Sequence, residues 1–398
     1  MTDEFMRRPP TDDPSLPFRL TADDLISDLA WPALLRAPRL AFRPGRVGLA
    51  VVLVLALSLV DQLMARAVGG STIAESVASA FLAAGRSASE MLLSLDVGGA
   101  IRALVVGLGN GVRSAWDDAP LRASVLLPVS VFGFAFGIVA IGRLSAEEFC
   151  RGRSGAWHDG LHWAAHCVGG IAVAYALPLV IAGIMIGVLA AGGWVLLSVP
   201  FVNIVGAALG VVGLVIAAGF VVILGGTFVG APVFAAAMAV EGSDGVDAMH
   251  RTYAYLFARP LRYAVYSVVL VLQGVVVVSV LGTLATLTVG TAIWAESLFL
   301  GERGSLVASG VASDRLTAGG RAAASVMNTV LQLPALLVTG YAVAYVASAG
   351  TVLYLALRRL VDGQDMIDLY VPGEIDAKLD EILDRRSTSM KQAGDDPL

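Results

Sequence analysis

Charged residues are scarce in this chain. Asp, Glu, Lys and Arg make up only 15% of its 398 residues, whereas they make up about 25% of a soluble domain. Apolar residues account for 57%, and the mean hydropathy is +0.78. This balance excludes an ordinary water-soluble protein and predicts a chain that folds in lipid.

Cysteine is nearly absent as well. Cys150 and Cys167 are the two cysteines of the chain, so no framework of paired cysteines is available. The aromatic content is also low, at 7%, while glycine is abundant with 44 residues. Small residues allow membrane helices to approach one another closely. The composition therefore predicts helix packing, rather than disulfides, as the source of stability.

The motifs of soluble enzymes are missing too. The sequence has no Walker A loop, no dinucleotide fingerprint between a strand and a helix, no HExxH and no nucleophile elbow in a plausible context. Its basic residues flank apolar runs, where membrane topology explains them, so nucleic-acid binding is unsupported. We therefore expect no nucleic-acid partner, and the question of an enzyme stays open, leaning towards no.

Apolar runs dominate what is present. Spanning a bilayer takes about 20 apolar residues, and the uncharged stretch 167–240 is too long for a single span. Trp194, Pro200 and Asn203 mark a turn within it. The predicted fold class is all-α, a polytopic integral membrane helical bundle with six transmembrane helices. Their expected ranges are 47–68, 123–142, 167–192, 205–240, 263–293 and 325–357.

The distribution of arginine and lysine predicts the orientation. Segments 1–46, 143–163, 241–262 and 358–398 lie on one side of the six spans and carry 19 of the 27 positive residues. That side is therefore predicted to be cytoplasmic, with both termini on it, in a multi-pass protein of the cell membrane. Membrane lipids are the expected partners.

The ends of the chain differ from its middle. Residues 1–20 are rich in Pro, Asp and Arg and are predicted to form a disordered cytoplasmic tail, followed by a membrane domain over 21–357. Residues 358–398 form the second cytoplasmic tail. Within it, apolar residues on one face predict a short amphipathic helix at 374–386, a candidate surface for a protein partner.

A repeat runs through the membrane domain. The residues Asp159-Gly160-Leu161-His162 recur 88 positions later as Asp247-Ala248-Met249-His250, and LLRAPRLAFRP at 34–44 is echoed by YLFARPLRYAV at 255–265. Each copy precedes a long apolar run. We interpret the repeat as three modules, each with an interfacial elbow helix followed by a helical hairpin.

The same segments carry a family resemblance. GRLSAEE at 142–148, DAMHRTYAYLFARPLRY at 247–263 and LRRLVDGQD at 357–365 resemble an uncharacterised group of bacterial multi-pass membrane proteins. More loosely, they resemble the membrane domain that accompanies glycerophosphoryl diester phosphodiesterases. The second resemblance implies an auxiliary membrane module, since the soluble catalytic domain of those enzymes has no counterpart here. The first resemblance, to the bacterial group, implies that the protein is located in a bacterial inner membrane.

Three histidines form the main candidate site. His158, His162 and His166 are spaced i, i+4 and i+8, which places them on one face of a helix. Two histidines at i and i+4 can bind zinc or copper. The remaining ligands would come from nearby residues. The alternatives are that these rings contact lipid headgroups, or that they form a pH-responsive cluster. The candidate additional ligands are Glu147, Glu148, Asp159, Cys167 and His250.

Arg143 and Glu147 are the second candidate pair. Their i,i+4 spacing at the end of the second span predicts an ion pair that anchors a helix end, with a proton or substrate relay as the alternative. Glu241 ends the fourth span in a similar way. The middles of spans two to six contain no ionisable residue, which argues against an ion-coupled carrier.

Four GxxxG spacings predict close helix contacts, either within the chain or between copies. They are Gly133/Gly137, Gly183/Gly187, Gly206/Gly210 and Gly226/Gly230.

Three functions remain open from the sequence. The first is a non-catalytic membrane protein that organises a partner or the lipid surface. The alternative is a transporter or permeation component for a small or lipid-like substrate, which predicts a polar cavity near the bilayer midplane. A membrane enzyme that acts on lipid through the histidine cluster is the third.

Overall fold

The computed structural model describes residues 31–370, apart from 199–201 and scattered positions between 70 and 95. The described residues are helical with no strand, and six of their helices are long and apolar enough to cross a membrane. The predicted all-α fold class with six spans is therefore confirmed, and the chain is a multi-pass membrane protein. The predicted tail 1–20 and the predicted helix 374–386 lie outside the described residues.

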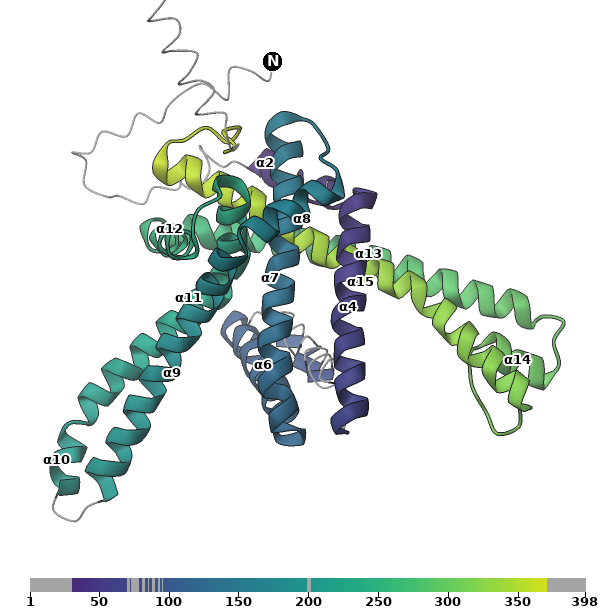
Figure 1. Ribbon diagram of the computed structural model, residues 1–398, viewed down its shortest axis with the longest axis horizontal. Coiled ribbons are helices and arrows are strands. Elements are labelled where there is room, and N and C mark those ends of the chain that lie inside the picture. Colours follow the sequence, from purple (N-terminus) through teal and green to yellow (C-terminus); the bar gives the residue numbers. More distant parts are fainter. Residues whose placement is uncertain are drawn as a thin grey trace, which may run out of the picture.

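The six long helices form three hairpins that diverge from one junction (Figure 1). Neighbouring helices within each hairpin pack along each other. The three pairs are α4 (Pro44–Val68) with α7 (Pro120–Arg151), α9 (Val168–Ser198) with α11 (Gly210–Glu241), and α13 (Pro260–Ser297) with α15 (Ala318–Asp362). We call the junction the vertex and the diverging parts the legs. The vertex comprises residues 139–151, 233–241 and 347–358 with the short helices that pack on them.

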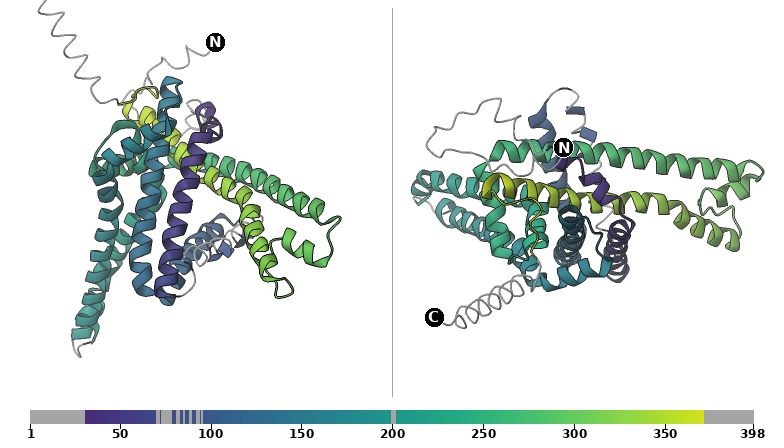
Figure 2. Two further views of the ribbon diagram at one scale, coloured as in Figure 1. Left: turned by 45° about the vertical axis from the view of Figure 1, so that its right-hand side comes forward. Right: turned by 90° about the horizontal axis from the view of Figure 1, so that it is seen from above.

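Short helices occupy both ends of the hairpins (Figures 1 and 2). At the vertex, each hairpin is preceded by short helices, as the three-module interpretation predicted. These are α2 (Trp31–Leu34) and α3 (Ala37–Ala41) for the first hairpin, α8 (Trp157–His166) for the second and α12 (Gly245–Ala258) for the third. Away from the vertex lie α6 (Val97–Asp118), α10 (Val202–Ala208) and α14 (Glu302–Ala308).

The same signal ends the last long helix of each module, and proline begins the first long helix of two of them. Pro44 and Pro260 stand at the first turns of α4 and α13, where proline costs no hydrogen bond. At the vertex, α7, α11 and α15 each end at a glycine with positive φ: Gly152 at 67°, Gly242 at 64° and Gly363 at 68°. Glycine adopts this left-handed conformation without strain. These stop signals confirm the repeat at the level of local backbone structure.

Most of the long helices extend beyond the predicted spans, whereas α11 begins at Gly210, five residues after the start of the predicted span 205–240. The predicted span 123–142 corresponds to Pro120–Arg151, and 325–357 corresponds to Ala318–Asp362. The sequence criterion excluded charged residues, and so it stopped short of Arg143 and Arg358. In the structure these charges lie on helical turns that pack inside the vertex, because they have partners there.

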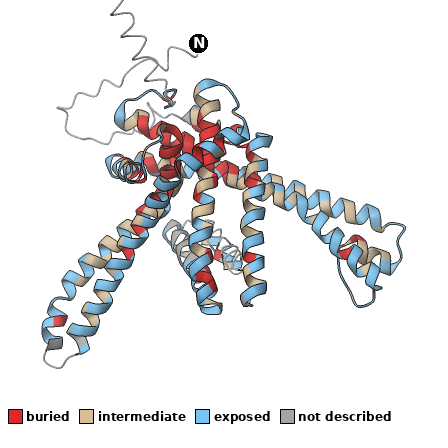
Figure 3. Ribbon diagram, in the orientation of Figure 1, coloured by how far each residue is buried: buried red, intermediate tan, exposed pale blue. Residues whose placement is uncertain are grey.

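Burial separates the vertex from the legs (Figure 3). Phe234 and Tyr354 are fully buried at the vertex, whereas Leu214 and Val275 on the legs are 71% and 58% exposed. The vertex therefore contains the protein core. The legs present their apolar side chains outwards, where lipid covers them.

Prolines lie inside α9 and α11, close to the vertex. Pro178 lies inside α9 and Pro232 inside α11. The Tyr175 hydroxyl donates a hydrogen bond to the carbonyl of Ala231 at 2.6 Å, and the Tyr263 hydroxyl donates to the carbonyl of Val229 at 2.9 Å. In lipid, backbone groups near a helix break need such partners. The two tyrosines thus tie neighbouring helices to the turn of α11 that precedes Pro232.

The glycines of the GxxxG pairs differ in whether they lie against a neighbouring helix. A Cβ added to Gly133 or Gly137 would lie 2.9 or 2.2 Å from the Cδ2 atom of a leucine on α4. Glycine at these two positions therefore allows α4 and α7 to pack tightly. Gly183 and Gly187 on α9 have nothing within 4 Å of an added Cβ. That pair faces outwards on a leg.

Candidate functional site: the polar vertex

Glu148 is the acidic centre of the first module. The Arg43 Nη2 lies 2.6 Å from Glu148 Oε1, and the Arg46 Nη2 lies 2.8 Å from Glu148 Oε2. Arg46 is buried, and its guanidinium also donates to the carbonyls of Leu40 and Leu144. The bond to Glu148 raises the pKa of Arg43. One carboxylate therefore joins the start of α4 to the end of α7 through two arginines.

Arg143 connects three other elements. Its Nε lies 2.9 Å from Glu147 Oε1, and its Nη1 donates to the carbonyls of Tyr370 at 2.9 Å and Ala239 at 3.2 Å. Its Cζ lies 3.8 Å from the centroid of the Trp163 ring, a distance at which a cation–π interaction stabilises both groups. The predicted Arg143–Glu147 pair is thus part of a larger set of contacts at the vertex.

Glu241 is the acidic centre where the second and third modules meet. Its carboxylate lies 2.5 Å from Arg251 Nη1 and 3.3 Å from Arg358 Nη1, and it accepts a hydrogen bond from the Tyr354 hydroxyl at 2.6 Å. Burial alone would lower the pKa of Arg251, but Glu241 and Asp247 raise it above its ordinary value. The carboxylate joins α11, α12 and α15, which explains an acidic residue at the end of the fourth span.

Asp362 repeats this arrangement at the end of the third hairpin. The Tyr255 hydroxyl of α12 donates a short hydrogen bond to Asp362 Oδ2. Burial raises the pKa of the Tyr255 hydroxyl, and the bond to Asp362 raises it further. Each hairpin therefore ends in a carboxylate that a neighbouring helix holds, at Glu148, Glu241 and Asp362.

Residues 363–370 extend this set of contacts beyond α15. The Arg358 Nη2 donates to the carbonyls of Asp365 at 2.9 Å and Asp368 at 2.6 Å. The Tyr370 N–H donates to the carbonyl of Val240 at 3.2 Å, and the Cys150 Sγ donates to the carbonyl of Met366 at 3.3 Å. The segment therefore lies across the ends of α7, α11 and α15 and fixes where the chain leaves the vertex.

The histidine cluster forms a surface row. His158, His162 and His166 lie on α8, and all three are exposed. At 1.5 Å per residue the first and last histidines are about 12 Å apart along the helix. Among the described residues, no three His, Cys, Asp or Glu side chains are arranged to hold a metal ion. The structure therefore does not bring together the ligands that the zinc or copper hypothesis requires.

One of the suggested additional ligands, Asp159, contacts the row, since its Oδ1 lies 3.3 Å from His158 Nε2. Glu147 and Glu148 bind arginines, as described above, and burial raises the pKa of the Cys167 thiol. Gly160 has a packing role, since an added Cβ would lie 2.6 Å from the carbonyl oxygen of Ala140. The glycine that weakens α8 as a helix thus lets it lie directly against α7.

A basic surface lies beside these contacts. Arg36, Arg39 and Arg43 follow one another along the elbow before α4, and all three are exposed, as are the apolar residues Leu35 and Phe42. Arg36 lies over the Phe149 ring, and Arg39 has no carboxylate within ion-pair distance among the described residues. We call Arg36, Arg39, Leu35 and Phe42 the elbow surface. It combines positive charge with apolar side chains that face outwards.

Chemically, these contacts are ion pairs and hydrogen bonds that join different helices. The carboxylates at the centres of the three modules each accept a hydrogen bond from an arginine or a tyrosine. Ion pairs of this depth stabilise only when both partners are present, because a single buried charge is costly. The arrangement can hold three hairpins in one orientation.

Sequence reasoning missed several of these residues. Arg46, Arg251 and Arg358 appear in the sequence as ordinary arginines near the ends of apolar spans. The repeated order of an acidic residue shortly before a glycine, at 148–152, 241–242 and 362–363, was the available signal for the three helix ends. Their arginine and tyrosine partners come from other elements, so the local sequence does not reveal the pairing.

Comparison with known proteins identifies no similar protein. No protein-family model matches the chain, and neither a curated protein nor a solved structure matches it significantly.

Proposed function

We propose that this protein is a non-catalytic scaffold of the cell membrane that organises anionic lipid around its vertex and presents its C-terminal tail to a protein partner. The observation that carries the proposal is the difference between the vertex and the legs. The contacts within the chain concentrate at the vertex, where the elbow surface presents arginines and apolar groups together. In this proposal the vertex lies at the cytoplasmic face, with both termini on that side.

The arrangement of the connections supports this orientation. The described parts of the arginine-rich segments, 31–46, 143–163, 241–262 and 358–370, meet at the vertex, and the other connections lie towards the far ends of the hairpins (Figure 1). Positive residues favour the cytoplasmic side of a membrane. The cytoplasmic leaflet is also the one that carries anionic lipids.

The elbow surface has the chemistry of a lipid-headgroup contact. Between residues 31 and 60 the chain contains four arginines and no acidic residue. Arg43 and Arg46 form ion pairs with Glu148. Arg36 and Arg39 are exposed beside Leu35 and Phe42. Each arginine near an anionic leaflet contributes about 1 kcal/mol of binding. Apolar side chains next to them would enter the acyl region.

Lipid binding to purified protein tests the proposal. The full chain, stripped of lipid in detergent, is titrated with phosphatidylglycerol or phosphatidylcholine, and native mass spectrometry counts the bound lipids. We expect the wild-type protein to prefer phosphatidylglycerol. The double variant Arg36→Gln/Arg39→Gln should lose roughly tenfold or more of that preference, since two charges are removed.

A matched control uses arginines of the legs. Arg303 and Arg315 are both exposed near α14, away from the vertex, and Arg303→Gln/Arg315→Gln should keep the preference. Equal preference in all three proteins would contradict a vertex that organises anionic lipid. Release of a lysolipid or a free headgroup during the titration would contradict the non-catalytic part of the proposal.

The three repeated hairpins favour one other candidate, a transporter for a small or lipid-like substrate, because repeats underlie alternating access in many carriers. A transporter requires the hairpins to move relative to one another. Spin labels at Val215→Cys and Leu287→Cys, with both native cysteines replaced by serine, measure the distance between two legs. A single distance distribution supports the scaffold, whereas two populations that exchange on addition of lipid substrate support the transporter.

A further inference from the structure

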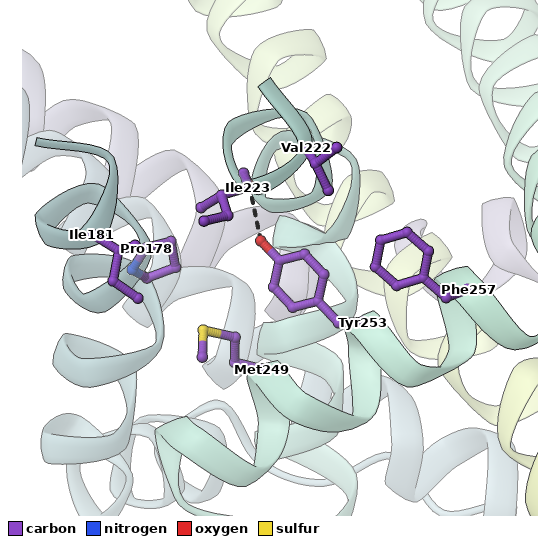
Figure 4. A pocket seen from close by; sticks show the side chains of 7 residues that line it. All are labelled: Pro178, Ile181, Val222, Ile223, Met249, Tyr253 and Phe257. Atoms are coloured by element: carbon purple, nitrogen blue, oxygen red, sulfur yellow. Dashed lines mark hydrogen bonds between the residues drawn. The ribbon is translucent and has the colours of Figure 1, made fainter. Parts of the chain in front are cut away.

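Two surfaces beside the vertex differ in whether the chain covers them. The first is an apolar depression of about 240 Å³ between α9, α11 and α12 (Figure 4). It is open, since Val222 and Phe257 in its lining are 51% and 63% exposed. The second surface carries hydrogen-bonding groups and is covered by residues 363–370, which we call the strap. The second surface therefore has an occupant in the structure, and that occupant is a peptide.

Two buried arginines bind the backbone of the strap. The Arg358 Nη2 donates to the carbonyls of Asp365 at 2.9 Å and Asp368 at 2.6 Å. The Arg143 Nη1 donates to the carbonyl of Tyr370 at 2.9 Å. Bonds to the main chain provide affinity for a peptide without depending on its side chains. The arginines thus form the part of the surface that recognises the strap as a peptide.

Two side chains of the strap, four positions apart, add specificity. Met366 is only 6% exposed and packs into the core of the vertex. The Tyr370 ring lies 6.3 Å from the Trp163 ring, and its N–H donates to the carbonyl of Val240 at 3.2 Å. Gly242 leaves room for both rings, because an added Cβ would lie 3.2 Å from each of them. The surface therefore accepts an apolar residue and an aromatic residue at this spacing.

Release of the strap would leave no arginine without a carboxylate. The Arg143 Nε lies 2.9 Å from Glu147 Oε1, and the Arg358 Nη1 lies 3.3 Å from Glu241 Oε1. A buried charge is costly when it loses its ionic partner, and neither arginine loses its partner here. Departure of the strap therefore breaks hydrogen bonds to carbonyls but keeps both ion pairs of the vertex.

The strap is joined to α15 by a glycine that can act as a hinge. Gly363 has a φ of 68°, and an added Cβ there would meet nothing within 4 Å. Glycine changes its backbone conformation at little steric cost. On the strap itself the side chains of Asp365, Ile367 and Asp368 are exposed. The strap can therefore swing away from a hinge that lies in open space.

We infer that the surface beneath the strap is a peptide-binding site, and that the strap occupies it as an autoinhibitory segment of the same chain. The partner that fits is a protein with an exposed segment of the same pattern, an apolar residue followed four positions later by an aromatic one. Strap and partner compete for the same arginines, so the partner binds only when the strap is released. The inference does not rest on lipid binding, and the lipid titration above can fail without affecting it.

Binding of a synthetic peptide tests the inference. The peptide has the sequence of residues 362–370 with both ends capped, carries fluorescein, and is titrated with the full chain in detergent while fluorescence anisotropy is recorded. Met366→Asp in the full chain places a charge at the buried anchor and releases the strap. We expect this variant to bind the peptide at least roughly tenfold more tightly than the wild type, because only molecules with a vacant surface can bind. A peptide that itself carries Met366→Asp should not bind.

Ile367→Asp is the matched control. It adds the same charge at the next position of the strap, where the side chain is 50% exposed. This variant should keep its strap in place and bind the peptide as weakly as the wild type does. Equal binding by all three proteins, or no binding by a folded Met366→Asp variant, would overturn the inference.

Hydrogen exchange on the wild type provides a second test that needs no variant. The peptide is added in excess and is labelled with carbon-13, so that its mass differs from that of the strap. Displacement breaks the bond from the Tyr370 N–H to the carbonyl of Val240, and we expect faster exchange at Tyr370 with unchanged exchange in the buried residues 233–240. Unchanged exchange at Tyr370 would contradict a strap that competes with a peptide for the surface.

Discussion

The vertex and the legs are built from the same helices but are stabilised in different ways. In α11, residues 233–240 are all buried, while Val211, Leu214 and Val215 near its other end are 67 to 71% exposed. The two parts of this helix are similarly apolar in sequence. Protein contacts surround one part, and lipid must surround the other. Hydrophobicity alone therefore does not identify the core of this protein.

Polar groups make the difference between the two regions. At the vertex, carboxylates, arginines and tyrosine hydroxyls from different helices bind one another. On the legs, hydroxyls such as those of Thr283 and Thr286 donate to carbonyls of their own helix. In lipid, apolar contact between helices has no hydrophobic driving force, so polar bonds and close packing hold them together. The position of interhelical polar bonds thus decides where the hairpins join.

Removing a deeply buried arginine of the vertex should have the largest effect. Arg358→Met leaves Glu241 with one cation fewer and frees the carbonyls of Asp365 and Asp368. Loss of one partner of a buried ion pair costs about 3 to 5 kcal/mol. We expect a loss of that size in the free energy of unfolding, measured by denaturant titration in mixed micelles.

Arg315→Met provides the comparison on a leg. Arg315 lies 2.7 Å from Glu302, but both side chains are about three-quarters exposed. An exposed pair contributes roughly 0 to 1 kcal/mol, so this variant should unfold almost like the wild type. Similar losses in both variants would remove the distinction between a vertex that holds the fold and legs that do not.

Glycine-to-alanine substitutions should change the free energy of unfolding by an intermediate amount. The change should be a loss at the vertex and no change or a gain on a leg. A Cβ on Gly245 would lie 2.1 Å from the carbonyl oxygen of Gly170 and 2.8 Å from the nitrogen of Ala174. Both are backbone atoms and cannot rotate away. Gly245→Ala should therefore push α12 from α9 and lower the free energy of unfolding by about 1 to 3 kcal/mol.

Gly183→Ala should act in the opposite direction. An added Cβ meets nothing within 4 Å, and alanine is about 1 kcal/mol more favourable than glycine inside a helix. The same denaturant titration should show unchanged or slightly increased stability. If Gly183→Ala destabilised the protein strongly, the outward face of α9 would have to be a contact surface between copies.

The sequence predicts the legs better than the vertex. The long apolar runs identified the six spans, and the recurrence of Asp159 to His162 at Asp247 to His250 identified the elbow helices. Both signals are local along the chain. The pairing of Arg46 with Glu148 joins residues 102 positions apart, and such pairs depend on how the hairpins cross. The i,i+4 spacing of Arg143 and Glu147 placed that pair correctly but gave no sign of Trp163 or Tyr370.

The histidine row shows the limit of spacing as evidence. His158, His162 and His166 do share α8, as their periodicity indicated. Metal binding also requires a ligand from another element, and the candidate glutamates are held by arginines instead. A helical period does not encode the tertiary contacts that would complete such a site.

The smallest expected effect concerns single hydroxyl groups. Tyr175→Phe removes the 2.6 Å bond from α9 to the carbonyl of Ala231, just before Pro232. The ring stays in place, so the loss is that of one hydrogen bond between helices, about 0.5 to 1.5 kcal/mol. On a leg, Thr283→Val removes a bond within one helix, and surface changes of that kind usually stay within about 0.5 kcal/mol. A larger loss from Thr283→Val than from Tyr175→Phe would mean that bonds within a leg matter as much as bonds between helices, because each variant removes one hydroxyl and differs mainly in what that hydroxyl joins.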